Sequence, residues 1–280
     1  MKRFFLIGFQ RSGTTLLDYL LNAHPEVVSI CEWELIPMIY SGSLHRLHDT
    51  DFDSFVKVKK NHNVDVEDYL RLLDTYRAKK ISTHQFIEQA CDLCVHDDKI
   101  KVVGAKEAIP LSRRKFRFMK KLYRDFGKCT DIVFIERDIK GIVNSYMKLG
   151  FLPVGNRKIS EKNIKSFVKH YVKYMNHIDK ILSLFPRTIY VRYRDLMDVP
   201  QNTLKMIFEF LGVASDDSTL DAIIKTPCRT SRVNFEGIVS ERKEGWRVRL
   251  SSDMAGFIDV YYKKNRKFFC EKTQDVYAAT

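Results

Sequence analysis

Two glycines and two threonines near the amino terminus have the spacing of a phosphate-binding turn. Residues 4–9 form an apolar run, and the motif Gly8-x-x-x-x-Gly13-Thr14-Thr15 overlaps its end and leads into a leucine-rich stretch. When a strand enters a helix through such a turn, several backbone N–H groups point into one concavity, where the helix dipole adds partial positive charge. The stretch therefore predicts a cradle for anionic oxygens.

Position 14 distinguishes this cradle from the P-loop of enzymes that hydrolyse nucleotides. Those loops have lysine where this chain has Thr14. Without the lysine, the turn is weakly equipped for a triply charged terminal phosphoryl group and its magnesium ion. A cradle with Arg11 and two hydroxyls suits a less charged group.

Alternating strands and helices must hold this turn in place. Apolar runs predict strands at 4–9, 27–30, 101–105, 131–136 and 188–192. Amphipathic spacing and capping residues predict helices at 14–23, 65–78, 83–95, 112–126, 139–149, 164–184, 200–211 and from Ser251 or Ser252 to about 269. This order indicates a parallel sheet with right-handed connections. We therefore predict an α/β fold: one P-loop-like, three-layer domain over residues 1–280, with a central parallel sheet flanked by helices.

Two further segments are expected to form the walls of a binding site. Residues from about 40 to 99, after the second strand, indicate a helical insertion that shapes an acceptor cleft. Residues 228–249 have little periodicity and indicate a long functional loop for cofactor and acceptor. Glu32 and Lys106 each follow a predicted strand, and ligand chemistry in open α/β sheets gathers at that edge.

The composition favours anionic ligands. Lys and Arg (48) exceed Asp and Glu (35) by 13. Unless it only forms a solvated basic surface, this surplus suits anionic ligands or partners: a nucleotide, a polyanion, nucleic acid or membrane headgroups, and it leans toward an acidic acceptor. No compact Lys/Arg run is backed by aromatic residues, so nucleic acid is not favoured as a partner. The sequence has no signal peptide and no apolar run that could span a membrane, so we expect a cytoplasmic protein.

The six cysteines are scattered, at positions 31, 91, 94, 129, 228 and 270. Cys91 and Cys94 have C-x-x-C spacing, but they lie in a helical pattern and no second metal-binding pair accompanies them. We interpret them as buried or partly exposed thiols. Cysteines of a cytoplasmic protein should be reduced, and no cluster of residues indicates a metal site.

Four blocks of the sequence resemble, in the same order, the sulfotransferases that use 3′-phosphoadenosine 5′-phosphosulfate (PAPS). They are residues 11–15 (Arg-Ser-Gly-Thr-Thr), 135–138 (Ile-Glu-Arg-Asp) with Ser145, 191–196 (Val-Arg-Tyr-Arg-Asp-Leu) with Pro200 and 210–212, and 245–247 (Gly-Trp-Arg) with 250–251. Within the family, the chain is most similar to the tyrosylprotein and Golgi-type carbohydrate branches, through residues 23–27 followed by Glu32 and through residues 104–106. It departs at Ile139, where the family usually has proline.

The resemblance implies a reaction. The chain would transfer a sulfuryl group from PAPS to a hydroxyl or amine of an acceptor, such as a saccharide or a tyrosyl or phenolic group. Glu32 would be the general base, with Glu34 as its rival, and Lys106 would stabilise the charge that develops during transfer. We interpret His24 as a structural residue at a helix end.

The resemblance also implies how the donor is bound. The residues that would hold the 5′-phosphosulfate are Arg11, Ser12, Gly13, Thr14 and Thr15. Arg137 and Ser145 would bind the 3′-phosphate, while Tyr193 either hydrogen-bonds near the cofactor or packs in the core. The residues that would close over the nucleotide, unless they form only a basic surface loop, are Arg242, Lys243, Gly245 and Trp246.

Two other functions stay open at this point. An ATP-dependent small-molecule kinase with a degenerate P-loop would need a phosphate-binding lysine, which Thr14 replaces, and a magnesium ligand, for which Asp138 is a weak candidate. A non-catalytic module that binds polyanions would keep the fold without the transfer. The oligomeric state is equally open.

Overall fold

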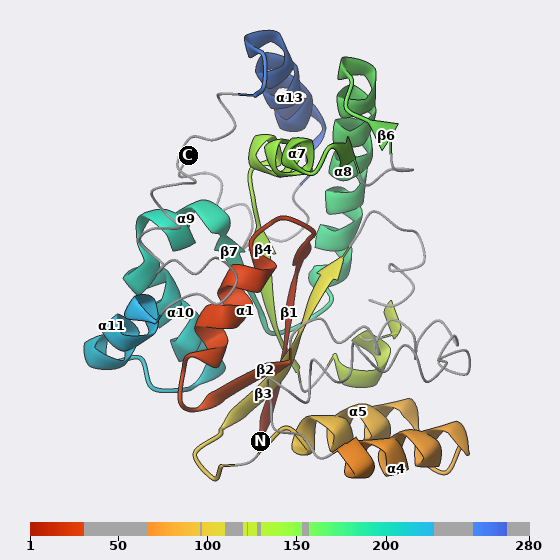
Figure 1. Cartoon of the computed structure of the whole chain (residues 1–280), viewed down its shortest axis with the longest axis vertical. Helices are drawn as coiled ribbons and strands as arrows, with labels where there is room; N and C mark the ends of the chain where they lie inside the picture. Colours follow the sequence, from red (N-terminus) through yellow and green to blue (C-terminus); the bar gives the residue numbers. More distant parts are fainter. Residues whose placement is uncertain are drawn as a thin grey trace.

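Five parallel strands form the central sheet of the computed structural model, which describes residues 1–30, 66–95, 97–109, 120–121, 123–127, 130–152, 157–226 and 249–267. The strands are β1 (Lys2–Phe9), β2 (Val27–Ile30), β3 (Val102–Ile109), β4 (Thr130–Glu136) and β7 (Thr188–Arg192). They lie in the order β2-β3-β1-β4-β7, so β1 is central (Figure 1). Each pairing in this sheet is parallel, which confirms the predicted α/β architecture.

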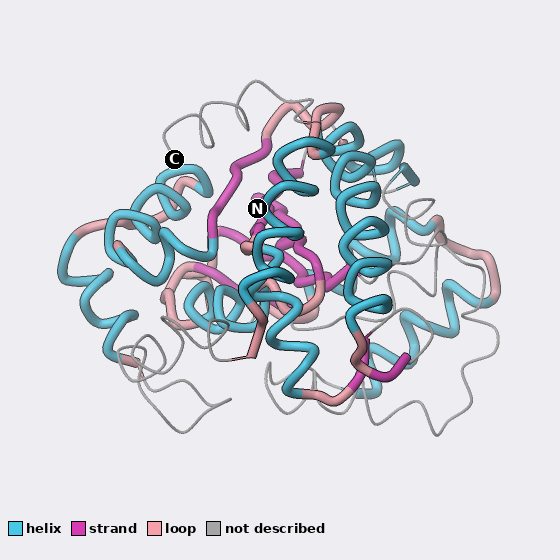
Figure 2. The backbone as a smooth tube through the Cα atoms, turned by 90° about the horizontal axis from the view of Figure 1, so that it is seen from above, coloured by secondary structure: helices cyan, strands magenta, loops and turns pink. Residues whose placement is uncertain are grey.

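Helices cover both faces of the sheet and make three layers, which Figure 2 shows from above. One face carries α1 (Thr14–Asn22), α9 (Tyr193–Asp198), α10 (Pro200–Leu211) and α11 (Asp217–Lys225). The other face carries α4 (Val66–Arg77), α5 (Thr83–Asp92), α7 (Ile139–Lys148), α8 (Glu161–Leu182) and α13 (Ser252–Asn265). A short antiparallel hairpin, β5 (Phe151–Leu152) and β6 (Arg157–Lys158), connects α7 to α8.

The central strand β1 contributes to both hydrophobic cores. Phe5, Ile7 and Phe9 pack with the helices that include α7 and α8, whereas Phe4 and Leu6 pack with α1 and α10. Successive side chains of a strand point to opposite faces. A strand that is buried on both faces is therefore apolar throughout, and this is why its sequence is a continuous hydrophobic run.

Side-chain caps fix where several helices begin. Ser251, one of the two serines that the sequence offered as a cap, accepts a hydrogen bond from the N–H of Met254 at the start of α13. Asp138 caps α7 in the same way. Ser160 accepts a hydrogen bond from the N–H of Asn163 and starts α8 three residues before the predicted boundary at 164.

Some sequence-based boundaries were wrong. β3 continues to Ile109 instead of ending at 105, because its second half pairs with the second half of β1. The helices α9 and α11 and the hairpin β5–β6 were not predicted. The predicted helix at 112–126 falls largely outside the described residues, as do residues 40–65 of the expected insertion and 228–248 of the expected loop. Among the described helices, none has the length and apolar character needed to cross a membrane.

Candidate active site

The turn between β1 and α1 has left-handed backbone at two positions. Arg11 has a φ of 71° and Gly13 a φ of 100°, and this conformation is strained for a residue with a side chain. The N–H and the hydroxyl of Ser12 both donate to the Phe9 carbonyl, at 3.0 Å and 2.6 Å. Ser12, which is buried, therefore holds the shape of the turn with both of its donors.

The two glycines of the predicted motif are sterically required. A Cβ at Gly8 would lie 2.6 Å from Cγ2 of Thr14, and a Cβ at Gly13 would lie 2.3 Å from Cδ2 of Tyr193. Neither position has room for a side chain, and Gly13 also has the left-handed backbone that favours glycine. The glycine spacing thus reflects close packing of the turn against its own helix and against α9.

The amino terminus of α1 has the features of an anion site. The N–H groups of the first helical turn have no acceptor inside the helix, and α1 has neither a side-chain cap nor an acidic residue in this turn. The partial positive charge at this helix end is therefore not compensated by the helix's own first turn. Within this first turn, Thr14 is buried and Thr15 is exposed.

Lys106 approaches this helix end from the neighbouring strand. It lies within β3 and its side chain is fully buried, yet its Nζ donates a hydrogen bond to Oγ1 of Thr15 at 3.0 Å. The sequence-based expectation placed Lys106 just after a strand; the structure places it inside the strand. A positive charge is therefore present at the cradle, although position 14 of the turn is not lysine.

Arg11, Ser145 and Arg137 meet on the other side of the turn. Nε of Arg11 donates to Oγ of Ser145 at 2.9 Å, and Nη1 of Arg137 donates to the Arg11 carbonyl at 3.1 Å. The helix α7 thus brings Ser145 to Arg11, and the Arg11 carbonyl links this pair to Arg137. The sequence predicted the three residues but not that Ser145 pairs with Arg11.

Tyr193 forms one wall beside these arginines. Its side chain is buried in the core under α1 and packs against Gly13. The guanidinium carbon of Arg137 lies 4.4 Å from the centroid of the Tyr193 ring, which is a cation–π arrangement. Tyr193 therefore packs in the core, as one of the two sequence-based interpretations had it, and it also orients Arg137.

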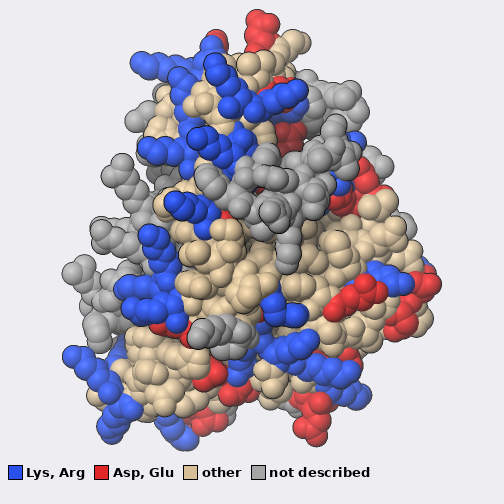
Figure 3. Space-filling model, turned by 180° about the vertical axis from the view of Figure 1, so that it is seen from behind, with Lys and Arg blue, Asp and Glu red and all other residues tan. Residues whose placement is uncertain are grey.

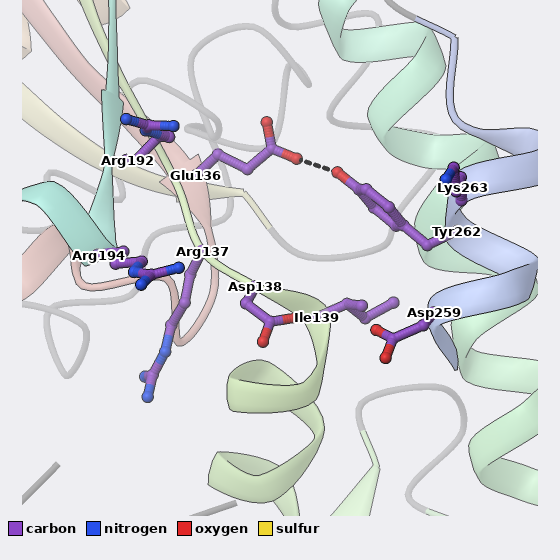
Figure 4. Close-up of a pocket in the computed structure, with 9 residues that line it drawn as sticks. All are labelled: Glu136, Arg137, Asp138, Ile139, Arg192, Arg194, Asp259, Tyr262 and Lys263. Carbon is purple, nitrogen blue, oxygen red and sulfur yellow. Dashed lines mark hydrogen bonds between the residues drawn. The ribbon is translucent and has the colours of Figure 1, made fainter. Parts of the chain in front are cut away.

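A pocket of about 380 Å³ adjoins Arg137 at the carboxyl ends of β4 and β7 (Figure 4). The residues that line it are Glu136, Arg137, Asp138, Ile139, Arg192, Arg194, Asp259, Tyr262 and Lys263. Several of these charges are paired: Nε of Arg192 lies 2.6 Å from a carboxylate oxygen of Asp195, and Nζ of Lys140 lies 2.8 Å from Asp259. Burial raises the pKa of Asp138, although the N–H of Lys140 donates to its carboxylate.

Sequence reasoning missed the contribution of α13 to this pocket. The hydroxyl of Tyr262 donates to Oε1 of Glu136 at 2.7 Å, across 126 residues of sequence. Nothing in the local pattern around Tyr262 signals that contact, because only the packing of α13 against α7 and α8 creates it. Glu136 lies within the block that resembles the sulfotransferases, but no role was assigned to it.

Six of the candidate site residues named from the sequence lie outside the described part of the chain. These residues are Glu32, Glu34, Arg242, Lys243, Gly245 and Trp246. β2 ends at Ile30, two residues before Glu32, so the described strand leads toward the carboxyl edge of the sheet. The roles of these residues stay predictions.

His24 is a structural residue, as the sequence analysis interpreted it. Its ring is buried, Nδ1 accepts the N–H of Glu26 at 3.0 Å, and Nε2 lies 2.8 Å from the Ala214 carbonyl. Because Nδ1 accepts, we assign the proton to Nε2, which then donates to Ala214. Both ring nitrogens are used in joining the end of α1 to the segment after α10.

Comparison with known proteins identifies the family of this fold. A family model described as the sulfotransferase family matches residues 3–217. No curated protein sequence matches the chain. Among the described residues, no group of three or more His, Cys, Asp or Glu side chains could hold a metal ion.

Solved structures of sulfotransferases have the same fold. The sulfotransferase domain from the curacin biosynthetic pathway is 18% identical, with a TM-score of 0.56, and the match covers 100% of this chain and 97% of that one. The sulfotransferase domain of the Synechococcus PCC 7002 olefin synthase is 14% identical, with a TM-score of 0.60 and coverage of 93% and 94%. A mouse sulfotransferase, SULT7A1, complexed with PAP is 12% identical, with a TM-score of 0.51 and coverage of 94% and 84%.

Proposed function

This chain belongs to the sulfotransferase family, and we propose that it transfers a sulfuryl group from PAPS to a hydroxyl or amine of an acceptor. One observation carries the proposal: the ammonium group of Lys106 lies 3.0 Å from the Thr15 hydroxyl, beside an α1 terminus that has no side-chain cap and no acid in its first turn. These features suit a phosphosulfate group.

The residues around the turn fit the two phosphates of the donor. The N–H groups of the first turn of α1 and the Thr15 hydroxyl would hold the 5′ end, with the Arg11 guanidinium at its side. Arg137 would bind the 3′-phosphate, because Tyr193 and the Arg11 carbonyl fix its planar guanidinium beside the turn. When bound, PAPS supplies the sulfuryl group and a phosphate leaving group.

The transfer needs a base and a stabilising cation. The acceptor oxygen or nitrogen forms a bond to sulfur, the bond from sulfur to the bridging phosphate oxygen breaks, and the acceptor proton passes to a base. We assign this base to Glu32, with Glu34 as the alternative, because the chain leaves β2 at the sheet edge just before them. Lys106 would stabilise the negative charge that grows on the bridging oxygen.

The acceptor class is also proposed. Lys and Arg side chains are numerous at the end of the molecule that carries α8 and α13, which is at the top of Figure 3. The lysines along the length of α8 are Lys162, Lys165, Lys169, Lys173 and Lys180. A positive field of this kind favours an acidic acceptor, such as a carboxylated saccharide or an acidic tyrosyl peptide. The cytoplasmic location stays a prediction from the sequence.

Two measurements test the proposal. Isothermal titration should detect binding of 3′-phosphoadenosine 5′-phosphate (PAP), the desulfated donor, and no comparable binding of ATP with magnesium; the reverse result would support the kinase alternative. A panel of hydroxyl and amine acceptors with PAPS that carries radiolabelled sulfate should then reveal transfer. PAP binding without transfer to any acceptor would support the non-catalytic module.

A further inference from the structure

Tyr262 in α13 and Arg266, the residue directly after this helix, both contact Glu136 at the end of β4, and Arg137 follows Glu136 in the sequence. We propose that Tyr262 and Arg266 are positioning residues: they fix the Glu136 carboxylate, and through it they set Arg137 for the 3′-phosphate of the donor. The inference rests on the proposed function, because it takes Arg137 as the 3′-phosphate ligand.

The contact between α13 and β4 is buried and charged. The Tyr262 hydroxyl donates to Oε1 of Glu136 at 2.7 Å, and Nη2 of Arg266 lies 3.6 Å from Oε2 of the same carboxylate. The side chains of Glu136 and Arg266 are 6% and 1% exposed. Charges buried to this degree hold their position because any displacement leaves an ion without its partner.

Arg266 also connects this contact to α8. Its Nη1 lies 3.8 Å from Oδ2 of Asp179, which is 1% exposed, and donates to Oδ1 of Asn176 at 3.3 Å. The carboxylates of Glu136 and Asp179 raise the pKa of Arg266 against the opposing effect of burial, so it stays a cation. Burial, and then the charge of Glu136, raises the pKa of Tyr262, so its hydroxyl stays a donor.

Glu136 and Arg137 are consecutive and face opposite ways. Figure 4 shows Glu136 and Tyr262 pointing toward one another, from β4 and α13, while Arg137 points away from Tyr262. On its own side, Arg137 contacts the Arg11 carbonyl and the Tyr193 ring. The end of β4 is therefore held from both faces of the sheet at the point where the 3′-phosphate would bind.

The end of β4 also determines where α7 starts. Asp138 caps the helix, which begins at Ile139 and carries Ser145 to Arg11. A shift of the β4 end would therefore move Arg137 and also change the distance between Ser145 and Arg11. An apolar contact between α13 and β4 would be enough for stability alone. A hydrogen-bonded Glu136 carboxylate also fixes the orientation of the backbone next to Arg137.

The test compares two nucleotides that differ only in the 3′-phosphate. Isothermal titration would give dissociation constants for PAP and for adenosine 5′-phosphate with the wild type, Tyr262→Phe and Tyr76→Phe. The control removes a phenol hydroxyl that lies 3.1 Å from Oγ1 of Thr83, in the α4–α5 pair. We expect Tyr262→Phe to weaken PAP by about tenfold, the scale of one hydrogen bond to a charged group, and to leave adenosine 5′-phosphate within about twofold. Tyr76→Phe should change neither.

Each outcome has one meaning. If Tyr262→Phe keeps the wild-type preference for PAP, or weakens both nucleotides equally, the positioning role is overturned and the proposed function stands. A wild type that binds PAP no more tightly than adenosine 5′-phosphate contradicts the assignment of Arg137, on which both proposals depend. If circular dichroism shows that Tyr262→Phe does not fold, Glu136→Gln replaces it in the same two titrations. This variant keeps an acceptor for Tyr262 but removes the charge that faces Arg266, and the same loss of preference for PAP is expected.

Discussion

Lys106 and Thr15 are 91 residues apart in the sequence, yet the ammonium nitrogen of Lys106 lies 3.0 Å from the hydroxyl oxygen of Thr15. The contact forms because β3 and β1 are neighbours in the sheet, with Lys106 in register with Leu6. A P-loop that hydrolyses nucleotides carries its lysine inside the turn. In this chain the adjacent strand supplies the lysine, and the turn itself supplies hydroxyl groups, backbone N–H groups and the Arg11 guanidinium.

Gly13→Ala should weaken donor binding. A Cβ there would lie 2.3 Å from the Tyr193 ring, on a backbone with a φ of 100°, so the turn must open and its N–H groups must diverge. PAP affinity by titration should fall by at least about tenfold, consistent with a cost of roughly 1–3 kcal/mol for strain of this kind.

A matched glycine in α13 provides the control. Nothing lies within 4 Å of a Cβ at Gly256, and Gly256 is in the helix interior. Gly256→Ala should therefore stabilise the protein by about 0.5–1 kcal/mol in urea unfolding and leave PAP affinity unchanged. Equal PAP affinity in both variants would contradict the assignment of the turn as the donor site.

Ser145→Ala should weaken PAP binding by removing the partner of the Arg11 side chain. The Arg11 guanidinium then loses a hydrogen bond of 2.9 Å and becomes more mobile, which we expect to cost about tenfold in PAP affinity. Ser183→Ala is the matched control, because the Ser183 hydroxyl donates only to the Lys180 carbonyl at the end of α8. An unchanged affinity for Ser145→Ala would show that Arg11 does not depend on Ser145 for its position.

Much of the fold follows from local sequence patterns. The strands β1, β4 and β7 are apolar because they are buried, and the Ser251 cap follows from a local hydrogen bond. By contrast, the length of β3 was underestimated because a lysine inside a buried strand is unfavourable unless its ammonium finds a partner. That partner, Thr15, is supplied by a different element of the fold.

The same limit applies to the site. The sequence named Arg11, Ser145 and Arg137 as candidate donor ligands, because each lies in a block typical of the family. It did not predict which of them pair, nor that Tyr262 contacts Glu136. These pairs join residues that are 126 and 134 positions apart in the sequence. They depend on how the helices pack, and local spacing does not predict that packing.

Glu26 should make the stability of the fold depend on pH. Its carboxylate is paired with Lys101 and accepts the N–H of Ala214 at 2.9 Å, and these contacts lower its pKa below 4.5. The stabilisation is therefore present above about pH 4.5 and is lost as the pH falls through the lower folded-state pKa. Glu26→Gln should cost about 1 kcal/mol at neutral pH.

Urea unfolding of the wild type and Glu26→Gln at several pH values measures this effect. The gap between their free energies of unfolding should narrow as the pH falls to about 3, because the wild-type carboxylate is then being protonated. A gap that is constant over this range would mean that the charge of Glu26 does not contribute to the free energy of unfolding.

Cys91 and Cys94 should resist alkylation in the native protein. Both are free and buried, and burial raises the pKa of each thiol from 9.0 to about 12. Near pH 8 the reactive thiolate fraction is therefore lower by roughly a thousandfold than for an unshifted thiol. Peptide mapping after iodoacetamide treatment should find these two positions modified only in denaturant; rapid modification in native buffer would argue against their burial.

Lys106→Met tests the central claim most directly, because methionine keeps a long unbranched side chain in β3 and removes the ammonium group beside Thr15. The measurement is the rate of sulfuryl transfer from labelled PAPS to an accepted acceptor, together with the dissociation constant of PAP. We predict that kcat falls by about 10²–10³, the effect of one lost electrostatic stabiliser, while PAP affinity changes by only a few-fold. A variant that transfers sulfate at the wild-type rate, or that loses PAP binding and turnover in equal measure, would contradict the account.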